Sequence, residues 1–149
     1  MMEKIRNIID STYFLTKQFL FLINENKAHR IFTKFSQLTV KLGLEKILFD
    51  NKDNYKDSLI PISNSAGFNK NGDIPLNFLK YLGFDRVVVG SVTAKPYSGN
   101  PEPNIKRFKK TESMVNWMGL PGKGAEYTAE KIESYNSSIP VTINLVPTP

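Results

Sequence analysis

The chain has 149 residues, 40% of them hydrophobic and 23% charged, which is the composition of a folded globular protein and argues against a disordered chain. It has no cysteine and one histidine, His29, which excludes disulfides, thiolate metal sites and multi-histidine sites, so no metal is expected. The net charge of +6 suits either an acidic membrane surface or an ordinary soluble basic surface. The basic residues are scattered and accompany no recognised motif, so nucleic acid is not an expected partner.

The first predicted element is a strongly apolar helix over residues 13–23, with Ser11 as its cap. Lys17 interrupts the helix, and its uncharged run is far shorter than the roughly 20 residues needed to cross a bilayer. The ten residues at the start carry charges of both signs, which does not fit a secretory signal.

A second helix is predicted after residues 24–26, with Gly43 at its C-terminal stop. Its apolar positions recur at steps of three and four, and its other face is basic. The apolar positions are Ala28, Ile31, Phe32, Phe35, Leu38 and Leu42. The two helices predict an amphipathic hairpin over residues 1–50, which either lies on a membrane surface or packs both apolar faces on the protein's own core.

Residues 51–57 are polar and predict a linker, and a strand is expected over 59–62. The strand breaks into small residues at Ala66 and Gly67, where a flat ligand can approach the backbone. Lys70 follows and reaches across such a site, although a lysine in a turn of this kind is also typical of a solvated surface.

The rest of the chain alternates between helix and strand patterns, which predicts an α/β fold with parallel strands. A helix runs from Leu76 to a stop at Gly83, and a buried strand follows over 86–90. Residues 94–103 are rich in proline and glycine and predict a long irregular loop. A further helix over 125–134 and a strand over 139–145 complete the pattern.

Three motifs, in this order and spacing, carry a resemblance to a known family. They are SAGFNKNGD at 65–73, GSVTAKPYSGNPEP at 90–103 and NWMGL at 116–120. Together they resemble the membrane-associated, quinone-linked dihydroorotate dehydrogenases, flavin enzymes of pyrimidine biosynthesis. The resemblance extends from about Phe14 to Asn144, which is almost the whole chain.

The resemblance implies an N-terminal two-helix hairpin followed by a (β/α)8 barrel that binds FMN. A complete barrel needs roughly 250 residues, so residues 58–149 suffice for only the first three to four strand-helix units. The chain is therefore expected to be part of a longer enzyme and inactive alone. The implied location is peripheral, on the cytoplasmic face of the cell membrane, where the hairpin contacts the bilayer and admits a membrane quinone.

The resemblance also assigns roles to single residues. The implied FMN contacts are Ala66, Gly67, Lys70, Ser91 and Asn144. The implied contacts to dihydroorotate or orotate are Lys70, Asn116, Met118, Gly119 and Leu120. The implied quinone-site residues are His29 and Arg107, although Arg107 also fits a basic surface run with its neighbouring lysines. The proton-accepting base is expected beyond residue 149, so no catalytic residue is named in this chain.

The chain departs from the family pattern in two places. Asn69 stands where an aspartate is common, and residues 120–122 (Leu-Pro-Gly) replace an aromatic residue and asparagines. The implied function is oxidation of dihydroorotate to orotate through FMN with a quinone as acceptor. The alternative is a non-catalytic basic module that binds membranes or a partner protein through the hairpin.

Overall fold

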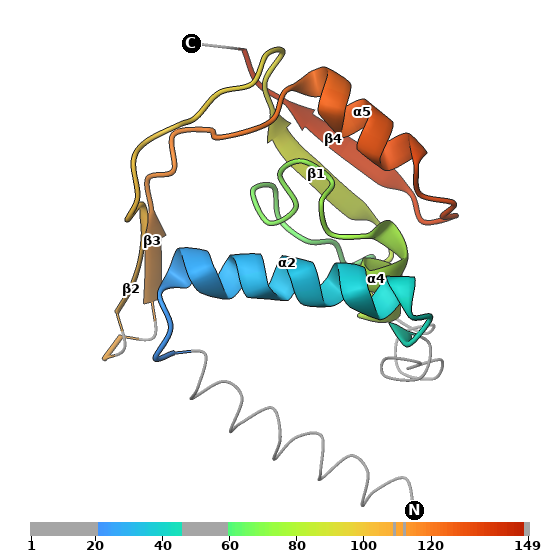
Figure 1. The fold of residues 1–149 in the computed structure, drawn as a ribbon, viewed down its shortest axis with the longest axis horizontal. Helices are drawn as coiled ribbons and strands as arrows, with labels where there is room; N and C mark the ends of the chain where they lie inside the picture. Colours follow the sequence, from blue (N-terminus) through green and yellow to red (C-terminus); the bar gives the residue numbers. More distant parts are fainter. Residues whose placement is uncertain (1–20, 46–59, 109, 112, 148–149) are drawn as a thin grey trace, which may run out of the picture.

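The structure is a computed structural model that describes residues 21–45, 60–108, 110–111 and 113–147. Figure 1 shows α2 crossing one side of the molecule, with β1, β4 and α5 on the other side. The elements in chain order are α2 (Glu25–Lys41), α4 (Leu76–Tyr81), β1 (Val87–Val92), β2 (Ile105–Phe108), β3 (Ser113–Asn116), α5 (Ala125–Glu133) and β4 (Val141–Leu145). Residues 13–20 of the helix predicted over 13–23, the linker 51–57 and Leu59 lie outside the described residues. The last residues of that predicted helix, 21–23, form a turn and a bend and no helix.

Two small sheets organise the described chain. β1 and β4 are parallel, in a register that runs from Val87 opposite Val141 to Gly90 opposite Asn144. β2 and β3, which follow β1 and precede α5 along the chain, form an antiparallel hairpin. The mixed α/β class is confirmed, and the described residues form no closed barrel.

The segment before α4 differs from the prediction, because residues 60–62 form no regular strand. The chain instead runs parallel to β1 through two isolated bridges, Ser63 with Arg86 and Asn69 with Val89. Between the bridges, the side chain of Asn64 makes the pair of hydrogen bonds to β1 that a backbone would make in a regular strand. Its amide donates to the carbonyl of Val88 at 2.7 Å and accepts from the Val88 N–H at 2.9 Å. The pairing therefore falls at residues 63–69 and not at the predicted 59–62, and it is not a regular strand.

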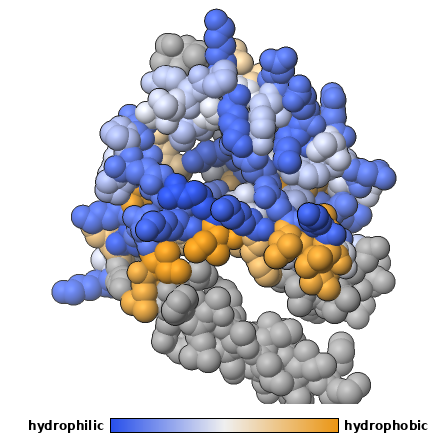
Figure 2. All heavy atoms as spheres, in the orientation of Figure 1, coloured by the Kyte–Doolittle hydropathy of each residue, from blue (hydrophilic) through white to orange (hydrophobic). Residues whose placement is uncertain are grey.

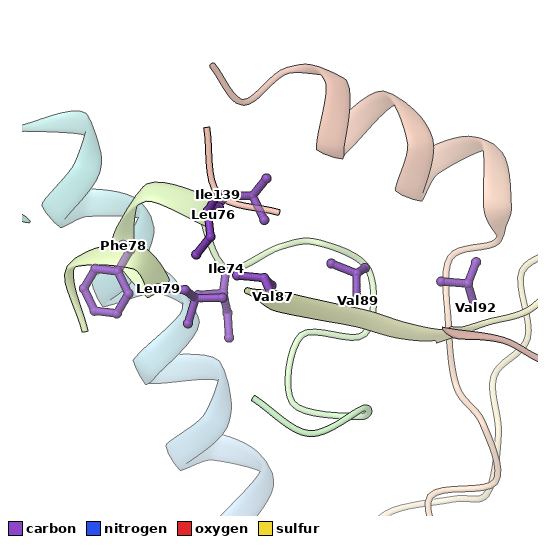
Figure 3. Close-up of a cluster of buried hydrophobic side chains, with 8 residues drawn as sticks. All are labelled: Ile74, Leu76, Phe78, Leu79, Val87, Val89, Val92 and Ile139. Atoms are coloured by element: carbon purple, nitrogen blue, oxygen red, sulfur yellow. The ribbon is translucent and has the colours of Figure 1, made fainter. Parts of the chain in front are cut away.

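The core lies between α4 and β1, as Figure 3 shows. Its buried side chains are Ile74, Leu76, Phe78, Leu79, Val87, Val89, Val92 and Ile139. The apolar run predicted for the strand at 86–90 supplies the β1 part, since alternate valines of a covered strand point to the helix side. Phe32 of α2 meets Phe78 with ring centroids 5.7 Å apart, so α2 packs on α4 through aromatic edges.

The ends of α2 follow from its sequence. Asn24 caps the first turn by accepting from the N–H groups of Asn26 at 3.1 Å and Lys27 at 3.3 Å. Gly43 ends the helix with a φ of +66°, a conformation that glycine adopts at little cost. The helix therefore ends where it was predicted to end, and it begins at Glu25, two residues earlier than predicted.

The two faces of α2 are not those of an ordinary surface helix. Its fully buried positions include Ser36 and Thr39, whose hydroxyls donate to carbonyls of their own helix. Four large apolar residues are instead about half exposed: Ile31, Phe35, Leu38 and Leu42. Figure 2 shows apolar atoms gathered in a band along this side of the molecule. We call these four residues the apolar stripe of α2. In the described part of the chain, no helix is long and apolar enough to span a membrane.

Candidate functional site

The residues predicted to contact a flavin lie on three neighbouring segments. The N–H of Gly67 donates to the carbonyl of Gly90 at 2.6 Å, which places the 66–67 turn beside the end of β1. The next residue, Ser91, accepts a hydrogen bond at 2.9 Å from the side-chain amide of Asn144 on β4. The structure thus brings Gly67, Ser91 and Asn144 into one row at the carboxyl ends of parallel segments. We call this row the strand-end site.

The strand-end site has room for a flat ligand at its first member. Gly67 has a φ of +90°, and a Cβ atom placed on it would meet nothing within 4 Å. Ala66 before it is exposed. The small residues of this accessible turn leave room for the planar face of an isoalloxazine ring. The hydroxyl of Ser91 and the amide of Asn144 beside the turn can hydrogen-bond the polar groups at the edge of the ring.

Gly90 sets how closely the strands approach at this site. A Cβ atom at this position would lie 2.5 Å from the carbonyl oxygen of Asn144 and 3.0 Å from the nitrogen of Val92. Its φ of +125° is also one that other residues rarely adopt. Only glycine therefore allows Ser91 and Asn144 to come together here.

Asn69 fixes the turn that carries Lys70. Its side chain is 1% exposed, accepts from the N–H of Ile74 at 3.0 Å and donates to the carbonyl of Ile74 at 2.9 Å. The amide needs both its donor and its acceptor for this pairing. An ionised aspartate would place a negative charge against the Ile74 carbonyl, which gives a physical reason for asparagine at this departure from the family pattern.

A cavity of about 330 Å³ lies between α2 and the 68–74 turn. It is lined by His29, Arg30, Thr33, Lys34 and Gln37 from α2, and by Phe68, Asn69, Lys70, Asn71, Asp73, Ile74 and Lys123. The His29 ring meets the ring of Phe68 edge to face, with centroids 6.0 Å apart. The structure therefore brings His29 and Lys70, predicted for different ligands, to the same cavity.

The cavity disfavours positive charge on both of these groups. Burial lowers the pKa of Lys70 below its ordinary value. Burial also lowers the pKa of His29, the Lys70 cation lowers it further, and the Asp73 carboxylate opposes them. His29 is therefore held neutral at physiological pH, and a bound anion would relieve the cost of the Lys70 charge.

The predicted substrate loop contacts Lys70 through Met118. The Nζ atom of Lys70 lies 2.7 Å from the Met118 sulfur. The backbone of this loop is paired with residues 97–104: the Asn100 N–H donates to the Met118 carbonyl at 2.9 Å, and Gly122 exchanges two bonds with Tyr97 at 2.8 and 2.9 Å. Gly119 and Leu120 both have positive φ, +68° and +57°. Asn116 ends β3 and is exposed.

Arg107 does not line this cavity in the described structure. It lies on β2 beside the first turn of α2, where its Nη2 donates to the Ile23 carbonyl at 2.7 Å and its Nε lies 3.4 Å from Glu25. Both predicted quinone residues thus lie near the start of α2. Of the two, His29 lines the cavity and Arg107 does not.

A polar cluster beside the cavity was not predicted from the sequence. Asp73 accepts from Tyr127 of α5 at 2.8 Å and from Asn71 at 3.0 Å, and Lys123 lies 3.3 Å away. Burial alone would raise the pKa of Asp73, but these hydrogen bonds and the Lys123 charge hold it below its ordinary value. The cluster ties the Lys70 turn to α5. Lys123 and Tyr127 are 50 and 54 positions from Asp73, so no local sequence signal reveals their contact with it.

Comparison with known proteins identifies the family. A family model described as dihydroorotate dehydrogenase matches residues 53–146. A "Dihydroorotate dehydrogenase (quinone)" of Natronomonas pharaonis is 39% identical over 85 residues, which cover 57% of this chain and 24% of that protein. One of Psychrobacter cryohalolentis is 29% identical over 139 residues, which cover 89% of this chain and 40% of that protein.

A solved structure agrees with these sequence matches. The crystal structure of DHODH from Eimeria tenella in complex with ferulenol superposes with a TM-score of 0.53 and 31% identity, covering 59% of this chain and 25% of that one. The chain thus spans between about a quarter and two fifths of the length of these relatives. The family match covers well over half of the chain, and it confirms the predicted resemblance: the chain belongs to the dihydroorotate dehydrogenase family.

Proposed function

We propose that the chain forms part of a quinone-dependent dihydroorotate dehydrogenase and supplies the first part of its FMN wall. The observation that supports this most directly is the strand-end site, in which Gly67, Ser91 and Asn144 meet beside the Lys70 turn. The quinone-type relatives support the substrate and acceptor classes. The overall reaction converts dihydroorotate to orotate and quinone to quinol.

We also propose that the described segments are the first strands of a (β/α)8 barrel. Residues 62–69, β1 and β4 are parallel neighbours in chain order, with α4 and α5 in the connections. Sequential parallel strands joined through helices are the building units of that barrel. Ligands in such barrels bind at the carboxyl ends of the strands, which is where the strand-end site lies.

The chain's own residues have distinct roles in this proposal. Ala66 and Gly67 accommodate the flat face of the cofactor, while Ser91 and Asn144 hydrogen-bond its edge. When bound, FMN supplies the two-electron chemistry that connects dihydroorotate oxidation to quinone reduction. The Lys70 cation attracts the substrate carboxylate and stabilises negative charge that develops beside it.

Residues 116–120 hold the planar substrate in this proposal. Asn116 offers both a donor and an acceptor to a ring edge. Met118, Gly119 and Leu120 form the loop wall next to Lys70, and the contact between Lys70 and Met118 supports this arrangement. His29 on the α2 side of the cavity faces the quinone.

The apolar stripe of α2 supports peripheral attachment to a membrane surface, and we propose that this is the cytoplasmic face of the cell membrane. Ile31, Phe35, Leu38 and Leu42 are 46–59% exposed on one side of a helix whose flanks carry Lys34 and Lys41. An apolar face with basic flanks is the pattern of a helix that lies in the interface of an anionic bilayer. The same stripe is compatible with the alternative, a non-catalytic module that binds membranes or a protein partner.

The test uses the protein purified from its native cells. Its intact mass is compared with the 16.9 kDa of this chain, and its visible spectrum and dihydroorotate-dependent quinone reduction are measured. The proposal expects a yellow flavoprotein whose flavin content and turnover fall by at least about tenfold in Lys70→Ala. Lys80→Ala, an exposed lysine on α4, is the matched control. A colourless protein without turnover, or a Lys70→Ala variant that behaves like the unmodified protein, contradicts the proposal.

A further inference from the structure

The turn that carries Lys70 is anchored on two sides. Just after α5, the hydroxyl of Tyr135 donates to the Gly72 carbonyl at 2.8 Å. From α2, the side-chain amide of Gln37 donates to the Asp73 carbonyl at 2.9 Å. Both bonds reach backbone oxygens of the turn, so they fix its path and not only its side chains. The turn is therefore a rigid frame against which a neighbouring loop can be held.

The side chain of Asn71 joins this turn to the loop that follows β3. Its Oδ1 accepts from the backbone N–H of Lys123 at 2.9 Å, and its Nδ2 donates to Oδ2 of Asp73 at 3.0 Å. Exchanging the two ends of the amide would put oxygen against the carboxylate and the NH2 group against the Lys123 N–H. The Asp73 carboxylate thus determines which way Asn71 faces.

The other oxygen of Asp73, Oδ1, is occupied by groups of α5 and the residues before it. It accepts from the Tyr127 hydroxyl at 2.8 Å and lies 3.3 Å from the Nζ atom of Lys123, which also donates to the Tyr127 hydroxyl at 2.9 Å. Both carboxylate oxygens therefore have donors. Lys123 is held twice, through its backbone by Asn71 and through its side chain by Asp73.

The loop of residues 116–122 meets the turn at one further point, Met118. The Met118 sulfur lies 2.7 Å from the Nζ atom of Lys70, but thioether sulfur is a weak acceptor. Lys123 follows five residues later, and its bonds go to an amide and a carboxylate. Bonds to charged groups are stronger than bonds to sulfur, so of these two attachments the one at Lys123 is the stronger. It sets the spacing between Lys70 and the loop.

We propose that Asn71 is a positioning residue, which Asp73 orients and which holds the loop of residues 116–122 at a fixed spacing from Lys70. Asn71 acts through the backbone of Lys123. The part of this inference that concerns a substrate bound between Lys70 and the loop rests on the proposed function. The part that concerns the attachment of the loop does not.

The decisive variant exchanges the two side chains. Asn71→Asp alone places two carboxylates side by side. Asp73→Asn alone leaves two donors facing each other, because an amide offers one oxygen where the carboxylate offers two. The double variant Asn71→Asp/Asp73→Asn keeps the net charge, and all of these hydrogen bonds can form again with the bond between positions 71 and 73 reversed in direction. Asn77→Asp is the matched control for an added carboxylate, since its amide makes only a bond of 3.4 Å in an exposed position.

The first measurement is the hydrogen exchange of the Lys123 backbone amide by NMR, in the full chain. The proposal expects exchange to become about tenfold faster in each single variant, because the bond to Asn71 is weakened or lost. The double variant should return to within about twofold of the unmodified protein, since the two changes compensate each other. Asn77→Asp should have no effect. Unchanged exchange in the single variants, or a double variant as fast as the single ones, overturns the proposal.

The second measurement is made on the enzyme purified from its native cells. The dissociation constant of orotate is obtained from the change in flavin absorbance, and the flavin content is determined beside it. Each single variant should bind orotate about tenfold more weakly, because the loop is misplaced from Lys70, and the double variant should recover the affinity. The flavin content should stay unchanged, since the strand-end site is not part of this cluster.

The flavin content separates positioning from a general loss of structure. If flavin is lost together with orotate affinity in the single variants, the cluster supports the fold and the proposal is wrong. If the double variant does not recover orotate affinity, the proposal is also wrong. Absence of flavin or of orotate binding in the unmodified enzyme would count against the proposed function, while the exchange of the Lys123 amide would still decide whether Asn71 holds the loop.

Discussion

The Nζ atom of Lys70 lies 2.7 Å from the sulfur of Met118, and thioether sulfur is a weak acceptor for a cation. The lysine is half-buried, and burial lowers its pKa. A charge kept in such a place costs stability and is expected to serve ligand binding.

Replacing this lysine should therefore separate stability from function. Lys70→Met is expected to leave the free energy of unfolding unchanged or to raise it by about 1 kcal/mol, because the cost of burying the charge is removed. Urea denaturation of both proteins measures this difference. Lys80→Met, at an exposed position, should change it by less than about 0.5 kcal/mol. A loss of more than 2 kcal/mol in Lys70→Met, on the order of a lost buried bond, would show that the cation supports the fold.

Gly90→Ala should destabilise the protein strongly. The added methyl group would lie 2.5 Å from the Asn144 carbonyl oxygen, and the φ of +125° is unfavourable for alanine. We expect a loss of at least about 2–3 kcal/mol in the free energy of unfolding, from strain and overpacking together. Gly43→Ala is the control, because its φ is +66° and nothing lies within 4 Å of an added Cβ. Equal losses in the two variants would mean that the close approach at Asn144 is unimportant.

Asn69→Asp should test whether the amide is needed at the Lys70 turn. At pH 7 the variant loses its donor to the Ile74 carbonyl and buries a carboxylate beside it, so we expect a loss of about 2–3 kcal/mol. At low pH the protonated acid donates again, and part of the loss should be recovered. Chemical denaturation at both pH values measures this. Asn77→Asp is the control, since its amide makes only a long bond of 3.4 Å in an exposed position. A variant as stable as the parent at pH 7 would contradict the role assigned to Asn69.

The carboxylate of Asp73 should make the free energy of unfolding depend on pH in the acid range. Its pKa is held below the ordinary 3.8, so it stabilises the folded state at pH values above 3.8, and this contribution is lost as pH falls through the lowered pKa. Asp73→Asn should cost about 1–2 kcal/mol at pH 7, where the charge-assisted bonds to Tyr127 and Lys123 are present. The two proteins should converge in strongly acidic solution. Glu130→Gln, an exposed acid, controls for net charge. A difference that stays constant across the acid range would rule out this origin.

Local patterns predicted most of the regular structure. α2, α4 and α5 show helical spacing and are followed by stop signals or polar turns, and the valines of β1 form a continuous apolar run. β4 begins at Val141, two residues later than predicted. The β2–β3 hairpin was missed because its strands are four residues long and one carries Lys106 and Arg107, which indicate a charged surface.

The site was predicted only as separate residues. The motifs placed Gly67, Ser91 and Asn144 at strand ends, where parallel strands bring residues together. The shared cavity of His29 and Lys70 depends on how α2 packs over α4, which periodicity cannot give. The Asp73 cluster and the Glu25–Arg107 pair join positions 50 and 82 residues apart, and polar pairs of this kind leave no local pattern.

The two paired loops at 97–104 and 117–122 are joined mainly by main-chain atoms. Tyr97 and Gly122 exchange their backbone bonds, and Trp117 donates from its backbone to Asn104. Main-chain pairing does not depend on which side chain is present. The shape of this wall is therefore robust to mutation at a position such as Pro121, and a saturation library there should yield many folded variants that differ in what they bind.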